Sequence, residues 1–223
     1  MFHTDLSLPS IEAAPRRPTQ LALIRHGEVE AAYQRVFGGR IDMNLSPRGH
    51  EQAATLAKWL ARQPLNAVYA SPMKRVQQTL APFATNNGWS ERAVTVPGLR
   101  EVDFGDWTGL SWDTVSERFG VSAFQWLTEL ERGGIANAEN ALTYRGRVEP
   151  FIEDILEKHP GENVAVFCHG GVIRMILSIL LGIPLPRMAG FEIDYASVTN
   201  VAVLPHKREV QFHNFTPWDE PGL

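Results

Sequence analysis

The chain lacks several features that would place it in particular classes of protein. It contains one cysteine, Cys168, which cannot form an internal disulfide, so we expect a reducing, cytoplasmic location. It has no basic cluster, and its net charge of −4 argues against a nucleic-acid partner. The apolar stretch 175–183 is interrupted by Ser178 and Gly182 and is too short to cross a bilayer. Residues 1–20 carry acids and prolines, so they are not a signal peptide, and we expect no membrane partner.

Strands and helices are predicted to alternate along the chain. Residues 1–18 contain three prolines and are interpreted as a flexible N-terminal arm, and residues 19–223 as a single domain. Apolar segments predict strands at 20–25, 66–70, 93–96, 163–168, 197–204 and 208–213. Start signals and periodicity predict helices at about 47–62, 73–86, 139–158 and 171–182.

This alternation predicts an α/β fold, a three-layer α/β/α sandwich around a mainly parallel central sheet. The last two strands are separated by a short turn, so we expect a hairpin and an antiparallel edge strand. Residues from about 104 to 138 have several glycines and short helical patches, which predicts a small helical insertion over the pocket. We interpret its tryptophans, Trp107, Trp112 and Trp126, as packing residues.

Charged or nucleophilic side chains follow the predicted strands at four places. The four sites are Arg25-His26-Gly27-Glu28, the run 71–79 containing Arg75, Glu101, and His169-Gly170. In an open α/β sheet, such residues at the carboxyl ends of strands build a pocket. Arginine binds anions in a fork geometry, a neutral imidazole can attack phosphorus, and helix amino-termini stabilise phosphate. The sequence therefore predicts a site for phosphoryl chemistry.

Taken in order, these motifs resemble those of the histidine phosphatase superfamily, the phosphoglycerate-mutase-like proteins, over about residues 21–204. Residues 37–46 are also similar to the stretch after the first motif in alpha-ribazole phosphatases, and the overall pattern is closest to these and to the broad-specificity phosphatases. The resemblance implies a phosphomonoester hydrolase that acts on a small organic phosphate through a phosphohistidine. The resemblance also implies that the enzyme needs no metal or cofactor, because fixed cationic side chains can oppose the negative charge that develops on the phosphoryl group.

The resemblance also implies a role for each matching residue. His26 is the expected nucleophile, and Glu101 is the expected proton donor and later the base that activates water. The expected phosphate-binding residues are Arg25, Arg75, His169 and Gly170.

The chain departs from the family pattern at two positions. Members often carry Ser or Thr, then Asn, three and six positions after the histidine, where this chain has Val29 and Ala32. A hydrogen bond to the substrate is therefore missing or comes from another side chain, with Tyr33 and Gln34 available nearby.

Three other functions fit parts of the sequence. A phosphoglycerate-mutase-type enzyme would carry the same motifs, but mutases typically have a longer insertion between Glu101 and His169. A non-catalytic phosphate-binding module would be expected to have lost a catalytic group, and none is lost. The run from Cys168 to Arg174 also matches the Cys-x5-Arg loop of cysteine-dependent phosphatases, in which the cysteine is the nucleophile.

Overall fold

A computed structural model describes residues 17–219, in which six strands form one sheet. The strands are β1 (Thr19–Arg25), β2 (Ala67–Ala70), β3 (Val94–Thr95), β4 (Asn163–Cys168), β5 (Val198–Leu204) and β6 (Lys207–Phe215). The α-helices are α1 (Pro47–Leu60), α2 (Lys74–Asn86), α3 (Trp112–Phe119), α4 (Trp126–Arg132), α5 (Ala141–Lys158) and α6 (Gly170–Leu181). None of the helices within this described range is long and apolar enough to cross a membrane.

The predicted strands and the long predicted helices are all present, with ends that shift by a few residues. The sheet order is β3-β2-β4-β1-β5-β6, and the first four of these strands are mutually parallel. β5 is antiparallel to both β1 and β6, which confirms the expected hairpin. The antiparallel strand lies one position in from the edge, because the hairpin adds β6 outside it. The predicted arm falls outside the described residues except for Arg17 and Pro18.

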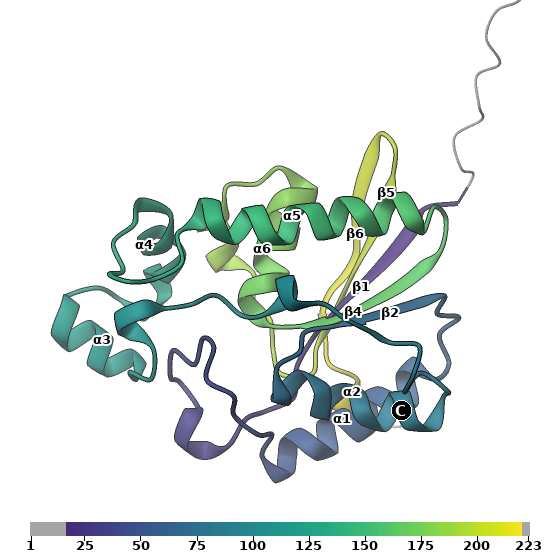
Figure 1. Cartoon of the computed structure of the whole chain (residues 1–223), viewed down its shortest axis with the longest axis horizontal. Coiled ribbons are helices and arrows are strands. Elements are labelled where there is room, and N and C mark those ends of the chain that lie inside the picture. The colour runs from purple at the N-terminus through teal and green to yellow at the C-terminus, as the bar shows by residue number, and fades with distance from the viewer. Residues whose placement is uncertain (1–16, 220–223) are drawn as a thin grey trace, which may run out of the picture.

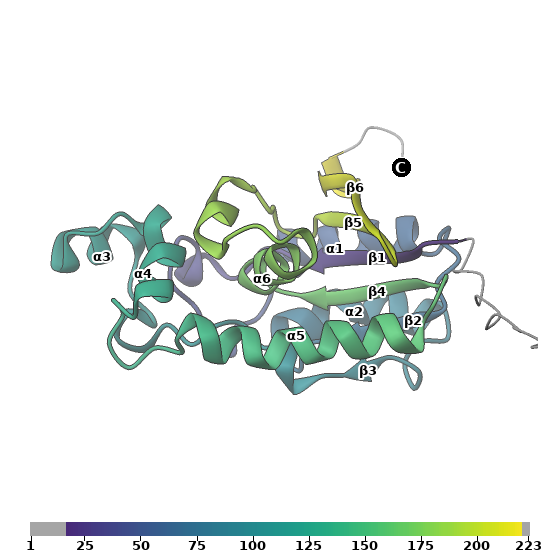
Figure 2. The ribbon, with the colours of Figure 1, turned by 90° about the horizontal axis from the view of Figure 1, so that it is seen from above.

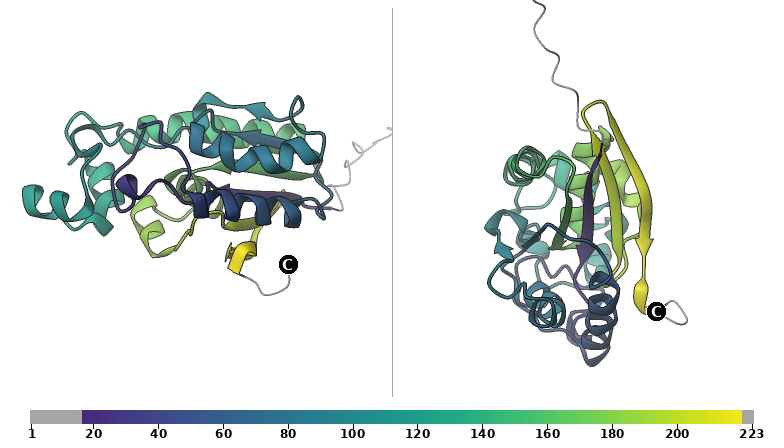
Figure 3. Two further views of the ribbon diagram at one scale, coloured as in Figure 1. Left: turned by 90° about the horizontal axis from the view of Figure 1, so that it is seen from below. Right: turned by 90° about the vertical axis from the view of Figure 1, so that its right-hand side faces the viewer.

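Helices cover both faces of the sheet, which gives the predicted three layers. α1 and α2 lie on one face, and α5 and α6 lie on the other (Figures 1 and 3). Val164, Val166 and Cys168 of β4 belong to the core beneath α5 and α6. Ala165 and Phe167 belong to the core shared with α1 and α2. Successive side chains of a strand point to opposite faces, so a strand buried on both faces is apolar throughout.

The turn after β1 packs directly against the start of α1. Ser46 caps that helix by accepting a hydrogen bond from the Gly49 amide at 3.0 Å. A Cβ at Gly27 would lie 2.7 Å from the Gly49 carbonyl oxygen, so this approach requires a glycine. The Gly27 amide also donates to Thr79 Oγ1 of α2 at 2.9 Å. Two helices thereby fix the turn that carries His26.

The segment 104–138 forms α3, α4 and short 3-10 turns at 105–107 and 123–125. It lies beyond the carboxyl ends of β1 and β4 (Figure 2). Trp112, Phe124 and Trp126 of this segment line a pocket at that end of the sheet, as expected for an insertion over the pocket.

Candidate active site

The pairing of β1 with β4 brings the two motif histidines together. These parallel strands place Arg25 opposite Cys168, so the residues that follow them, His26 and His169, are also neighbours. Their ring centroids lie 5.3 Å apart. Most of the predicted site residues line one pocket, namely Arg25, His26, Arg75, Glu101 and Gly170. His169 is fully buried beside them.

His26 presents an unprotonated Nε2 to this site. Its Nδ1 lies 2.8 Å from the Gly27 carbonyl oxygen, and because a carbonyl can only accept, Nδ1 carries the proton. Nε2 in turn accepts a hydrogen bond from Arg75 Nε at 3.2 Å. Burial, and then the charges of Arg75 and Arg25, hold the pKa of His26 well below its usual value. The ring is therefore neutral at neutral pH, the form that acts as a nucleophile.

Arg75 is held in place by the loop that follows the first motif. Its Nη1 donates to the Ile41 carbonyl oxygen at 2.8 Å, and its Nη2 donates to that of Gly39 at 2.9 Å. Burial lowers the pKa of Arg75 to about 10, against the opposing effect of Glu101, so the group stays charged at neutral pH. The stretch 37–46 therefore fixes the orientation of a buried cation.

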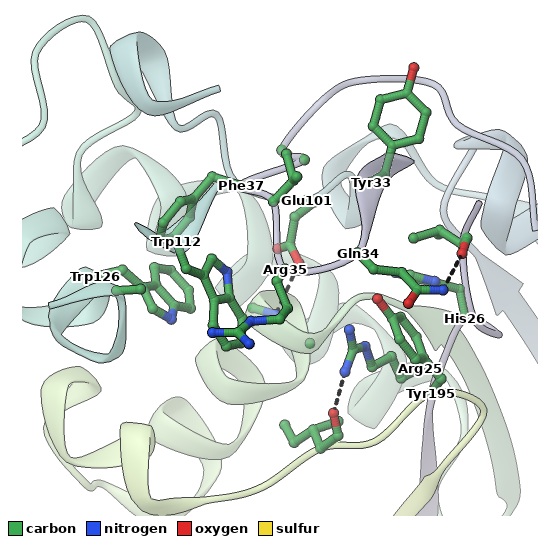
Figure 4. A pocket seen from close by; sticks show the side chains of 18 of the residues that line it. Arg25, His26, Tyr33, Gln34, Arg35, Phe37, Glu101, Trp112, Trp126 and Tyr195 are labelled. Atoms are coloured by element: carbon green, nitrogen blue, oxygen red, sulfur yellow. Dashed lines mark hydrogen bonds between the residues drawn. The ribbon is translucent and has the colours of Figure 1, made fainter. Parts of the chain in front are cut away.

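Arg25 lies on the other side of His26. Its Nη1 donates to the Ile193 carbonyl oxygen at 2.5 Å, and its guanidinium carbon lies 4.0 Å from the ring centroid of Tyr195 (Figure 4). The Tyr195 ring also lies 5.6 Å from that of His26. The Arg25 guanidinium, at the end of β1, and the Tyr195 ring, from the loop before β5, thus complete this wall of the pocket.

Three buried nitrogen atoms of the site have no hydrogen-bond partner among residues 17–219: Arg25 Nε, Arg174 Nε and His169 Nδ1. His169 Nε2 lies 2.9 Å from Ser71 Oγ, and we assign the hydroxyl as donor, which places the ring proton on Nδ1. Burial, with Arg75 adding to it, keeps the pKa of His169 well below its usual value, so the ring has only that one proton. Because buried polar groups are normally paired, these donors mark a place for an anion.

Glu101 faces the same pocket with both carboxylate oxygens engaged. Oε2 accepts from the Gly171 amide at the start of α6 at 3.1 Å, and Oε1 accepts from the Val102 amide at 3.0 Å. The buried Tyr144 hydroxyl also donates to Oε1, at 3.3 Å. Burial, and then the carboxylate of Glu101, raise the pKa of Tyr144 well above its usual value, so its phenol remains a donor. A Cβ on Gly171 would overlap Oε1, so this arrangement depends on a glycine there.

The backbone around Glu101 is clamped by Arg147 of α5. Arg147 Nη1 donates to the carbonyl oxygens of Gly98 and Arg100 at 2.5 and 2.7 Å, and Nη2 donates to that of Glu101 at 3.2 Å. Glu139 pairs with the same guanidinium at 2.6 Å. Arg147 cannot be recognised from the sequence, because no local pattern links it to a loop so far away in the chain.

The geometry excludes Cys168 as a nucleophile. The residue is fully buried and packs in the core beneath α5 and α6. Burial raises the pKa of its thiol far above the usual value, so no thiolate forms near neutrality. Arg174, the other member of the Cys-x5-Arg pattern, does line the pocket, and donates to the Gly170 and Phe191 carbonyl oxygens at 3.2 and 2.9 Å.

The two departures from the family pattern lie in different settings. Val29 is buried, lines the pocket and forms an isolated bridge with Leu45. Ala32 is exposed on a short 3-10 turn. Both candidate substitutes, Tyr33 and Gln34, line the pocket, and Gln34 Nε2 donates to the Val29 carbonyl oxygen at 3.2 Å. Both side chains therefore lie at the pocket, with the Gln34 amide nitrogen already engaged by the Val29 carbonyl.

The three tryptophans of the insertion differ in environment. Trp107 is 1 % exposed and packs against Phe37, as expected for a packing residue. Trp112 and Trp126 are half-buried; they pack against the core, as expected, and they also line the pocket. The helices of the insertion are short, so no helical periodicity in the sequence distinguishes its buried side chains from those that face the pocket.

The chain is similar in sequence to known phosphatases. The model for the histidine phosphatase superfamily (branch 1) matches residues 21–216. A putative phosphoserine phosphatase 2 of Hydrogenobacter thermophilus is 27 % identical over 195 residues, which cover 87 % of this chain and 95 % of that protein. The adenosylcobalamin/alpha-ribazole phosphatase of Escherichia coli is 28 % identical over 175 residues, covering 78 % of this chain and 85 % of that protein.

Solved structures share the fold. The crystal structure of a putative alpha-ribazole-5′-P phosphatase of Escherichia coli has a TM-score of 0.75 and 26 % identity, covering 89 % of this chain and 97 % of that one. A mycobacterial glucosyl-3-phosphoglycerate phosphatase has a TM-score of 0.76 at 20 % identity, covering 89 % of this chain and all of that one.

Proposed function

This chain belongs to the histidine phosphatase superfamily, and we propose that it hydrolyses small organic phosphomonoesters through a phosphohistidine on His26. The protein is a phosphatase, in keeping with its family and its named relatives. The proposal concerns the steps of the reaction and the residues that perform them.

The state of the His26 ring supports this proposal most directly. The Gly27 carbonyl holds the ring proton on Nδ1, so the lone pair of Nε2 faces the pocket. Burial, and then the charges of Arg75 and Arg25, lower the pKa of His26, so the ring is neutral without any base to deprotonate it. A neutral imidazole next to fixed cations is suited to attack a phosphate dianion.

In the first step, Nε2 attacks phosphorus as the bond from phosphorus to the ester oxygen breaks. The Arg75 Nε–H, which now donates to Nε2, turns to a phosphoryl oxygen. Arg25 Nε and His169 Nδ1, which have no partner among the described residues, donate hydrogen bonds to the phosphoryl oxygens. The positive amino-terminal end of α6, at Gly170, stabilises the negative charge of the phosphoryl group. Phosphoryl transfer requires mainly such positioning and charge stabilisation, which these groups supply without a metal or cofactor.

Glu101 would begin the reaction protonated, give this proton to the departing alcohol oxygen and become a carboxylate. In the second step its carboxylate would take a proton from water as the water oxygen attacks phosphorus. The bond from phosphorus to Nε2 then breaks, inorganic phosphate leaves, and the lone pair returns to His26. Hydrogen bonds from Tyr144 and from the start of α6 hold the Glu101 side chain where it can donate the first proton and accept the second.

We also propose that the enzyme is a single domain over residues 19–223 that acts on free small molecules in the cytoplasm. Its net charge of −4 and lack of a basic cluster suit neither a nucleic acid nor an anionic membrane surface as partner. The relatives are named for different substrates, phosphoserine and alpha-ribazole phosphate, so family membership leaves the organic group open.

The proposal is tested by phosphate release from a panel of phosphomonoesters after exhaustive treatment with a chelator. We expect full activity in the chelated wild type and its loss in His26→Asn, which keeps a polar side chain but no nucleophilic nitrogen. His206→Asn, which changes an exposed histidine outside the pocket, is the matched control and should be fully active. Activity that returns only with an added divalent ion, or that persists in His26→Asn, would contradict the proposal.

A further inference from the structure

The pocket is much larger than its phosphate-binding end requires. Its volume is about 570 Å³, which falls within the range of cavities that enclose a drug-sized ligand. The inner end contains the two arginines and His26, so the remaining volume is left for the organic group of the substrate. The residues that line this outer part therefore select among substrates.

Aromatic side chains from the insertion form one wall of the outer part. We call Trp112, Phe124 and Trp126 the aromatic wall. The rings of Trp112 and Phe124 meet edge to face with centroids 5.6 Å apart. Figure 4 places Trp112 and Trp126 on the side of the pocket opposite Arg25 and Tyr195. Phe124 is 73 % exposed, so a large apolar surface at the pocket mouth is left in water.

Trp112 of the aromatic wall is tied to the catalytic turn. The segment 35–37, which lies in the loop after His26, pairs with 109–112 of the insertion. The Trp112 amide donates to the Arg35 carbonyl oxygen, and the Phe37 amide to that of Leu110, both at 2.9 Å. This pairing fixes the backbone of Trp112 relative to the loop that follows His26, so this part of the wall is in place before a ligand binds.

A cation lies against the same wall. The guanidinium of Arg35 lies 5.4 Å from the ring centroid of Trp112, and its ion pair with Asp113 is long, at 3.7 Å, and exposed. Arg35 has a φ of +55°, a left-handed conformation that is rare outside glycine. This strained backbone conformation places an exposed guanidinium at the pocket. A guanidinium plane and an indole both stack on planar rings.

We propose, on the basis of the function proposed above, that the preferred substrates are phosphomonoesters whose organic group carries a planar aromatic ring. The ring stacks on the aromatic wall while the phosphate occupies the site at His26. Stacking on exposed aromatic side chains tolerates many ring types, so the class is defined by a flat aromatic group and not by one hydrogen-bonding pattern.

Adenosine 5′-monophosphate and ribose 5-phosphate test this directly. In both, the oxygen that leaves phosphorus is the 5-oxygen of ribose. The two substrates therefore differ in the aromatic base and not in the leaving oxygen atom. We expect the wild type to have a kcat/KM for the nucleotide at least about tenfold above that for the sugar phosphate. In Trp112→Ala and Phe124→Ala this ratio should fall towards one, because kcat/KM for the nucleotide falls more than kcat/KM for the sugar phosphate.

Leu142→Ala removes an equally exposed apolar side chain outside the pocket and should leave the ratio as in the wild type. A wild-type ratio near one, or a high ratio that survives both wall substitutions, would overturn the inference while leaving the phosphatase mechanism intact. Hydrolysis of a simple alkyl phosphate that has no ring, with neither ribose ester accepted, would also overturn it. If none of the three esters is hydrolysed, the proposed function itself fails.

Discussion

Arg75 Nε donates a hydrogen bond to His26 Nε2 at 3.2 Å, so a buried cation lies directly on the nitrogen that we propose as nucleophile. Arg75 follows β2 and His26 follows β1, and these strands are separated in the sheet by β4. The contact forms because the carboxyl ends of the three parallel strands share one edge of the sheet. Burial and this contact together keep the imidazole neutral, and the contact places a phosphate-binding group within reach of the attacking atom.

Removing the positive charge of Arg75 should raise the pKa of His26. In Arg75→Gln the burial effect remains while a coulombic effect is lost, so the histidine should titrate at higher pH than in the wild type. The measurement is a ¹⁵N-histidine NMR titration of both proteins. Arg174→Gln serves as the control, because Arg174 is not among the groups that shift His26. Identical His26 titrations in wild type and Arg75→Gln would contradict this coupling.

The protein should lose stability as the pH falls below about 6.5. The pKa values of His26 and His169 are both lowered in the folded state from the usual 6.5, so the unfolded chain binds more protons in this range. The two histidines therefore make their full contribution to the free energy of unfolding above about pH 6.5. The free energy falls on acidification by up to about 1.4 kcal/mol per pH unit for each histidine.

Urea denaturation at several pH values between about 7.5 and 5.5 measures this slope. His169→Gln removes one of the two groups and should make the slope clearly shallower. A slope equal to that of the wild type would mean that the burial of His169 is not linked to its protonation.

Displacing Glu101 should slow alkyl phosphates more than aryl phosphates. In Gly171→Ala the new Cβ overlaps Glu101 Oε1, so the carboxylate must move. Loss of a general acid costs roughly a hundredfold or more, but p-nitrophenolate leaves without protonation. The single-turnover rate of enzyme phosphorylation should therefore fall strongly for an alkyl phosphate and little for p-nitrophenyl phosphate, as in Glu101→Gln.

Gly146→Ala is the matched control for this substitution. A Cβ at Gly146 in α5 meets open space, so the change should leave both rates alone and stabilise the helix by about 0.5–1 kcal/mol. Equal slowing of both substrates in Glu101→Gln would argue against Glu101 as the proton donor.

Replacing Cys168 should leave the chemistry intact. The thiol is fully buried and packs in the core, so Cys168→Ser should keep most of the wild-type kcat, and iodoacetamide should not inactivate the native enzyme. A rate reduced to that of His26→Asn would restore the cysteine mechanism.

The sequence predicted what local patterns determine. Alternating apolar segments and helix start signals, such as Ser46 before Pro47, located the elements that build the sheet and its two helical layers. Motifs at strand ends located His26, Arg75 and Glu101, because the carboxyl ends of parallel strands share one edge.

The remaining features depend on contacts between segments far apart in the chain. Arg147 clamps the Glu101 loop across a long sequence interval, and nothing near either residue indicates this. Trp107 and Trp112 both lie in the insertion, yet one is buried and the other lines the pocket. The pairing of 35–37 with 109–112, which fixes the backbone of Trp112, joins segments far apart in the chain and has no local signal in the sequence.

Detection of phosphate on His26 tests the central claim most directly. Enzyme mixed with substrate and quenched within one turnover should carry phosphate that is stable in base and released by acid. Peptide mass spectrometry under alkaline conditions should locate this phosphate on His26, and the same protocol applied to His26→Asn should find none. An enzyme that turns over substrate with no phosphate on His26, or with the phosphate on another residue, would contradict the account.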